Sequence, residues 1–130
     1  MIRKGARKKI RILLSFEERY RVYMEAMAAA IREFRPEVEV AVCDGEDLEE
    51  EAERFDPQLV ISSPPASENP VDDRLARIEL SPEPDQPSRF RVGDRYWEST
   101  NPALDEIFPV VDETKRLRRA AHDQEEPDDA

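Results

Sequence analysis

The stretch IRILLSFEE, residues 10–18, places a short apolar run directly before a pair of acids. The run from Ile10 to Leu14 is rich in isoleucine and leucine, which is typical of a strand buried inside a sheet. Ser15 stands three residues before Glu18, and this spacing is the pattern of a helix capping box. We therefore expect a buried strand that leads directly into a helix.

Farther along the chain, the pattern alternates between helix and strand. Apolar residues at spacings of three and four predict a helix over residues 17–35, and Pro36 ends it. The expected apolar face consists of Tyr20, Tyr23, Met27, Ala30, Ile31 and Phe34. A strand is predicted over 38–42, a helix after the cap residue Asp47, and a third strand over 59–61. Helical connections between strands predict parallel pairing, with helices on both faces of the sheet.

The second half of the chain predicts another strand over 76–80 and then a hairpin. Two strand-like runs flank Gly93-Asp94, and a two-residue turn there brings Phe90 opposite Trp97. The same register pairs Val92 with Arg95 and Arg89 with Glu98. An apolar pair and an ion pair thus support one hairpin register.

A last helix is expected after the hairpin. Asn101 should cap it, and Pro109 should kink or split it. Its expected buried stripe consists of Leu104, Ile107, Phe108 and Val111.

Composition limits the class of protein. The 130 residues carry 31 acidic and 20 basic side chains, a formal net charge of -11, and this length suits one domain. One cysteine, Cys43, and one histidine, His122, exclude an internal disulfide and an ordinary Cys/His zinc site. Three glycines are too few for a glycine-rich phosphate loop. We expect no cofactor and no metal. The sequence has no long apolar stretch and no signal-peptide pattern, which predicts a cytoplasmic protein without membrane contact.

Charge is distributed unevenly and predicts three regions. Residues 1–8 form a basic arm, residues 9–120 hold the α/β domain, and residues 121–130 form an acidic tail. We expect the tail to be disordered, because it has no large apolar side chain that could offset the entropy of ordering it. Prolines gathered between residues 63 and 88 predict mostly loop there.

Three segments carry a resemblance to a known family. They are KIRILL at residues 9–14, RFDPQLVI at 54–61 and GDRYWESTNP at 93–102. They resemble the first strand, the third strand with its preceding helix end, and the fifth-strand approach of the response-regulator receiver family. This resemblance implies a flavodoxin-like fold, a three-layer sandwich with a mainly parallel sheet, in which helices of the second half are missing or shortened.

The resemblance also implies where a phosphorylation site would lie, and most of its chemistry is missing. Ser62-Ser63 stands where the family has its phospho-accepting aspartate. Glu17 and Glu18 come slightly after the place of the acidic pair that holds Mg²⁺, and acids in a first helical turn are common without a metal. Ser81 matches the Ser/Thr switch residue, whereas Asn101 replaces a lysine and cannot supply its charge. We expect no catalytic residue and no metal. The remnant pocket consists of Glu17, Glu18, Ser63, Ser81 and Asn101.

The expected function is that of a non-catalytic pseudo-receiver, a signalling or regulatory domain that acts through protein contacts rather than aspartate phosphorylation. Its partner is a protein, with a second copy of the chain as one candidate. The expected interaction surface consists of Tyr96, Trp97, Lys115, Arg116, Arg118 and Arg119. Two alternatives stay open: a nucleic-acid-associated regulator that uses the basic termini, and a divergent phosphotransfer or small-ligand-binding domain. The net charge of -11 opposes binding of a polyanion.

Overall fold

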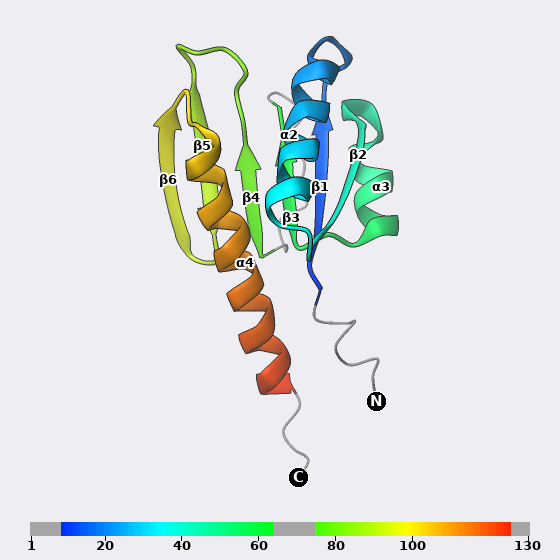
Figure 1. The fold of residues 1–130 in the computed structure, drawn as a ribbon, viewed down its shortest axis with the longest axis vertical. Helices are drawn as coiled ribbons and strands as arrows, with labels where there is room; N and C mark the ends of the chain where they lie inside the picture. Colours follow the sequence, from blue (N-terminus) through cyan, green and yellow to red (C-terminus); the bar gives the residue numbers. More distant parts are fainter. Residues whose placement is uncertain (1–8, 64–74, 126–130) are drawn as a thin grey trace.

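A computed structural model describes residues 9–63 and 75–125, and over these residues the chain is an α/β domain. Six strands form one mostly parallel sheet, and three helices cover its two faces (Figure 1). The strands are β1 (Arg11–Phe16), β2 (Glu39–Asp44), β3 (Leu59–Ser62), β4 (Ala76–Glu79), β5 (Pro87–Val92) and β6 (Arg95–Thr100). The helices are α2 (Arg21–Phe34), α3 (Leu48–Phe55) and α4 (Leu104–Glu125).

The sheet has the strand order β2-β1-β3-β4-β5-β6. β1 pairs in parallel with β2 and β3, and β3 pairs in parallel with β4, so the predicted alternation over the first half is confirmed. β5 and β6 then join antiparallel. The connection over residues 80–86 is too short for a crossover, which needs about a dozen residues, so the chain turns back beside β4.

The predicted hairpin is confirmed in its register. Phe90 lies opposite Trp97, and their rings stack with centroids 5.1 Å apart. Arg89 lies opposite Glu98, and the closest side-chain atoms of this ion pair are 3.7 Å apart. Gly93 takes a left-handed φ of 59° at the turn, which glycine adopts without steric cost.

Two apolar clusters hold the layers together. The larger one joins α2 and α4 to one face of β1, β3, β4 and β5, with Leu14, Ile31 and Val111 all fully buried. The smaller one packs α3 on the other face through Leu48 and Ala52 against Leu13 and Val60. Helices α2 and α4 therefore lie side by side on one face, as Figure 1 shows, and α3 lies on the other.

The start of α2 corrects the predicted capping box. β1 continues to Phe16, and the Ser15 hydroxyl donates to the main-chain carbonyl of Asp44 on β2. A short 3-10 turn, Glu18–Tyr20, then precedes α2. The strand is longer than predicted because two more residues in the sheet bury the Phe16 ring completely.

The predicted apolar face of α2 is rotated around the helix axis from the face that is buried. Met24, Met27, Ala28 and Ile31 face the sheet. Tyr23 and Phe34, both assigned to the core, are 39% and 58% exposed. Several rows of apolar residues fit helical spacing here, and the sheet surface selects the one centred on Met27 and Ile31.

Helix α4 differs from its prediction at both ends. Asn101 has a φ of 53° and lies before the helix, which begins at Leu104, so it is not the cap. Pro109 lies inside one continuous helix, so the predicted split is wrong. The helix also reaches Glu125, past the boundary expected at residue 120, because extending a formed helix adds a hydrogen bond for each residue fixed.

The basic arm at residues 1–8 and residues 126–130 of the acidic tail lie outside the described residues. No helix of the described segments is long and apolar enough to cross a membrane.

Candidate protein-binding surface

Exposed apolar side chains lie near both ends of α2. Val22 is 82% exposed near the start of the helix and Phe34 is 58% exposed at its end. Ala26 and Ala29 lie exposed between them. Single exposed apolar side chains are common on proteins, but several gathered on one helix are typical of an interaction site.

A cavity of about 310 Å³ lies between α2 and the start of α4. Tyr23 and Met27 line it from α2, and Leu104 and Ile107 line it from α4. The Tyr23 ring meets Phe16 edge to face, with centroids 5.9 Å apart, and burial raises the pKa of the Tyr23 hydroxyl above its usual value. The α2 face and the start of α4 thus share one apolar hollow that an apolar side chain of a partner could fill.

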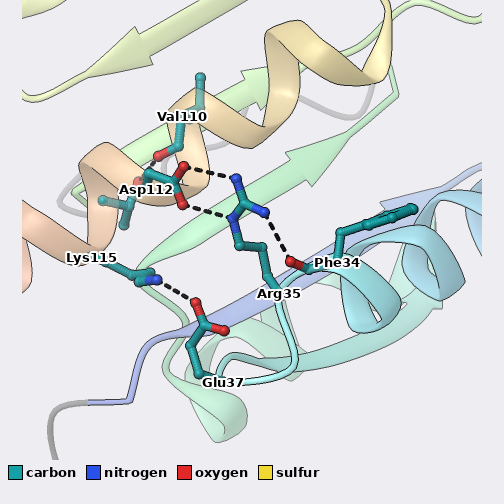
Figure 2. A network of polar contacts seen from close by, with 7 residues as sticks. Phe34, Arg35, Glu37, Val110, Asp112 and Lys115 are labelled. Atoms are coloured by element: carbon teal, nitrogen blue, oxygen red, sulfur yellow. Dashed lines mark hydrogen bonds and ion pairs between the residues drawn. The ribbon is translucent and has the colours of Figure 1, made fainter.

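A network of polar contacts, called the latch below, joins the end of α2 to α4 (Figure 2). The Arg35 guanidinium donates from Nε to one carboxylate oxygen of Asp112 at 2.8 Å and from Nη2 to the other at 2.9 Å. Its Nη1 donates to the Phe34 carbonyl oxygen at 2.8 Å, and the guanidinium lies 4.9 Å from the centroid of the Phe108 ring. Lys115 forms a second ion pair with Glu37. The latch joins the end of α2 to α4 across 77 residues of chain.

The latch perturbs the acidity of its carboxylates. The hydrogen bond from Arg35 holds the pKa of Asp112 below its usual value, and that from Lys115 does the same to the pKa of Glu37. The same contact with Asp112 raises the pKa of Arg35. Both carboxylates therefore favour the charged form more strongly in the folded protein than in the unfolded chain.

The Arg35–Asp112 pair should stabilise the domain at neutral pH and lose this effect in acid. Because the folded pKa of Asp112 is depressed, its contribution is fully present above the unfolded pKa, near 4, and falls as the pH drops through the folded pKa. Asp112→Asn should lower the free energy of unfolding by about 0.5–1 kcal/mol near neutral pH, since solvent screens this half-exposed pair. Near about pH 3 the difference should shrink toward zero.

Urea unfolding of both proteins at the two pH values measures this convergence. The matched control is Glu53→Gln, which changes an exposed carboxylate on α3, far from the latch. A stability difference for Asp112→Asn that does not change with pH would contradict the assigned role of the ion pair.

The residues of the predicted remnant pocket are only partly brought together. The Glu17 amide N–H donates to the Ser63 hydroxyl oxygen at 3.2 Å, and Glu18 begins the exposed turn beside them. Ser81 lies at the end of β4, where its hydroxyl accepts from the Glu83 amide at 3.2 Å. Asn101 follows β6, which β4 and β5 separate from β3. With strands about 4.8 Å apart, Asn101 lies too far from Ser63 to share a site with it.

A second cavity, of about 300 Å³, lies beside Tyr20 at the carboxyl ends of the parallel strands. Its polar groups bond to one another: the Tyr20 hydroxyl donates to Glu83 at 3.1 Å, and Arg89 donates to Glu79 at 3.2 Å. Because these groups already have protein partners, a ligand would have to displace them to bind.

The predicted interaction surface does not form a single patch. Tyr96 and Trp97 are neighbours in β6, so their side chains point to opposite faces of the sheet. Trp97 packs on Phe90 on the face that α4 covers, and Tyr96, 74% exposed, lies on the other face. The basic residues Lys115, Arg116, Arg118 and Arg119 lie in the second half of α4. Lys115 pairs with Glu37 and Arg116 with Glu113, which reduces the charge available to an anion.

The sequence did not point to the latch or to the exposed face of α2. Arg35 and Asp112 are too far apart in the chain for spacing to relate them. Val22 would have been identified only from a helical projection in which the buried row was assigned correctly.

In the described segments, no three metal-ligating side chains gather at one place. Burial raises the pKa of the Cys43 thiol, which makes it a weaker nucleophile at neutral pH. In comparisons with known proteins, the chain matches no family model, no curated protein and no solved structure.

Proposed function

We propose that this chain is a non-catalytic regulatory domain of receiver-like, flavodoxin-like type that acts by binding a protein through α2 and the hollow beside α4. The single observation that carries the proposal is the exposure of Val22 and Phe34 on one helix, next to an apolar cavity. A surface of this kind is costly in water unless a partner covers it for part of the time.

The order of the first four strands supports the receiver-like part of the proposal. The order β2-β1-β3-β4 with parallel pairing is that of flavodoxin-like sheets. The antiparallel hairpin and α4 take the place of the remaining strand and helices. The serines at the end of β3 and the distance to Asn101 favour a domain regulated by contact rather than by aspartate phosphorylation.

Pairing of the α4 bases favours protein binding over nucleic-acid binding. Non-specific affinity for nucleic acid comes from lysines and arginines whose charge is free to neutralise phosphates. In α4, Lys115 and Arg116 already neutralise acids of the same chain. The cavity beside Tyr20 supports small-ligand binding less than the α2 surface supports protein binding, because the Tyr20 hydroxyl already donates to Glu83.

A photo-crosslinking side chain placed at position 34 tests the proposal. Irradiation in extract of the native cells should give a discrete adduct, because position 34 lies on the proposed surface. Adding Ala26→Arg should reduce the adduct about tenfold or more, since it sets an unpaired charge in the middle of an apolar contact. The matched control places the same crosslinker at Glu53 on the opposite helix layer. Equal labelling from positions 34 and 53 would overturn the proposal.

A further inference from the structure

The exposed part of α2 consists of three strips that differ in chemistry. Successive residues turn by 100°, so the strip farthest from the sheet consists of Val22, Ala26, Ala29 and Glu33. The strip toward β2 consists of Arg21, Glu25 and Arg32. The strip toward α4 consists of Tyr23, Ala30 and Phe34. Contacts fix these directions: Arg21 pairs with Asp44 on β2, and Phe34 packs on Phe108 of α4 with ring centroids 5.8 Å apart.

This surface is complementary to itself when a second copy is turned end over end. A two-fold axis perpendicular to α2 reverses the direction of the helix and keeps each side strip against the same strip of the other copy. The strip toward β2 then meets itself in reverse order, which sets Glu25 opposite Arg32 of the second copy. The strip toward α4 does the same, which sets Tyr23 opposite Phe34 of the second copy.

One axis serves both side strips. The midpoint between residues 25 and 32 falls between residues 28 and 29, and so does the midpoint between residues 23 and 34. On the outermost strip, the midpoint between Ala26 and Ala29 lies one residue from this axis, which is about 1.5 Å along the helix. Small side chains thus lie where the two helices would cross, with apolar side chains on one side of the crossing and the Glu25–Arg32 pairs on the other. Glu33 of each copy lies on the outermost strip beside Val22 of the other copy, away from the crossing point.

Glu25 and Arg32 both have hydrogen-bonding capacity that contacts within the chain do not use. Glu25 is 56% exposed and has one partner on its own helix, Arg21, at 3.6 Å. The exposed Arg32 side chain uses Nη2 to donate to the Val40 carbonyl oxygen at 3.0 Å, and a guanidinium has five N–H donors. Each side chain can therefore accept or donate a further hydrogen bond.

We infer that the protein which binds this surface is a second copy of the chain, with the two α2 helices packed antiparallel and Glu25 of each copy paired with Arg32 of the other. This inference rests on the proposed function and names its partner. Charge complementarity of the helix with itself favours a second copy over an unrelated partner. Each copy carries a net charge of -11, so association should strengthen as salt screens the repulsion between them.

Charge reversal of the two residues, one at a time, tests the pairing. Sedimentation velocity of the full chain at about 0.15 M salt should show a monomer–dimer equilibrium between about 1 and 200 µM. Glu25→Arg places two arginines opposite each other, and Arg32→Glu places two glutamates opposite each other. Each variant alone should bind itself at least about tenfold more weakly than the wild-type chain.

An equal mixture of the two variants should recover the dimer. In the mixed pair, the arginine introduced at position 25 of one copy faces the glutamate introduced at position 32 of the other, and the unchanged Arg32 and Glu25 face each other, so all the opposed charges attract. The matched control reverses the exposed pair Glu51 and Arg54 on α3, which should leave self-association unchanged. Circular dichroism checks that each variant is folded, and Val22→Arg, at a position 82% exposed, gives a second disrupting change.

A wild-type chain that stays monomeric over the whole range would overturn the inference, as would a dimer that both variants leave intact or that their mixture fails to recover. These results are distinguishable from failure of the proposed function. A crosslinked adduct from position 34 with a different protein would preserve protein binding while excluding the homodimer, whereas no specific adduct at all would overturn both.

Discussion

A chain that ends at residue 103, before α4, is expected to lose cooperative folding. Ile107, Val110 and Val111 of this helix are at most 2% exposed and cover the face of the sheet that carries Phe90 and Ile78. Burying one such side chain contributes roughly 1.5–3 kcal/mol, and removing α4 exposes both partners of each contact. The summed loss exceeds or matches the roughly 5–15 kcal/mol by which a domain of this size is stable.

Thermal melting followed by circular dichroism measures the effect of this truncation. The matched control removes residues 123–130 only and should leave the melting temperature nearly unchanged, because the packed part of α4 stays in place. A cooperative transition in the chain that ends at residue 103 would show that the sheet and the other two helices form a stable unit without α4.

Phe90→Ala is expected to be the most destabilising single change in the hairpin. The ring is 1% exposed, stacks on Trp97 with centroids 5.1 Å apart and belongs to the cluster beneath α4. Truncating a buried phenylalanine leaves a cavity and costs about 3–5 kcal/mol. Tyr96 is the matched control: it lies on the same hairpin, is 74% exposed, and on truncation to alanine should change the stability by about 0.5 kcal/mol or less.

Urea unfolding of the two alanine variants gives both free energies directly. If Tyr96→Ala lowers the free energy of unfolding as much as Phe90→Ala does, then the Tyr96 side chain is buried in solution rather than exposed. If Phe90→Ala costs less than about 1 kcal/mol, the stack with Trp97 is not part of the stabilising core.

Much of the fold was predictable because the signals are local. A buried apolar run, alternating valines and the turn at Gly93-Asp94 each require only neighbouring residues, and they placed the first three strands and the hairpin. The face of α2 was not predictable in this way, because several apolar rows satisfy helical spacing and only the sheet decides which one is buried. The Ser15 capping box likewise does not form, because the strand continues through Ser15 and buries Phe16.

The candidate site was harder to predict because it depends on where elements lie in space. Glu17 and Ser63 follow adjacent parallel strands, and the expected proximity is seen in their hydrogen bond. Asn101 was grouped with them because residues 93–102 resemble the fifth-strand approach of a known family. The chain instead inserts β5 between β4 and β6. The latch between Arg35 and Asp112 was not predictable because its two residues are 77 positions apart and meet only where α4 packs beside the end of α2.

The 77-residue separation between Arg35 and Asp112 also affects how the chain folds during its synthesis. Residues 11–62 hold three adjacent strands and two helices, and they leave the ribosome well before α4, without which the domain is not expected to fold cooperatively. Helix α4 comes last in the described chain, and about 60 further residues must be synthesised before it is complete, which takes about 3–12 s at 5–20 residues per second. During that interval the face of the sheet that α4 covers and one flank of α2 stay exposed to solvent. The nascent chain is therefore most exposed to aggregation and to chaperone binding just before the last helix docks, and Arg35 awaits its carboxylate partner until then.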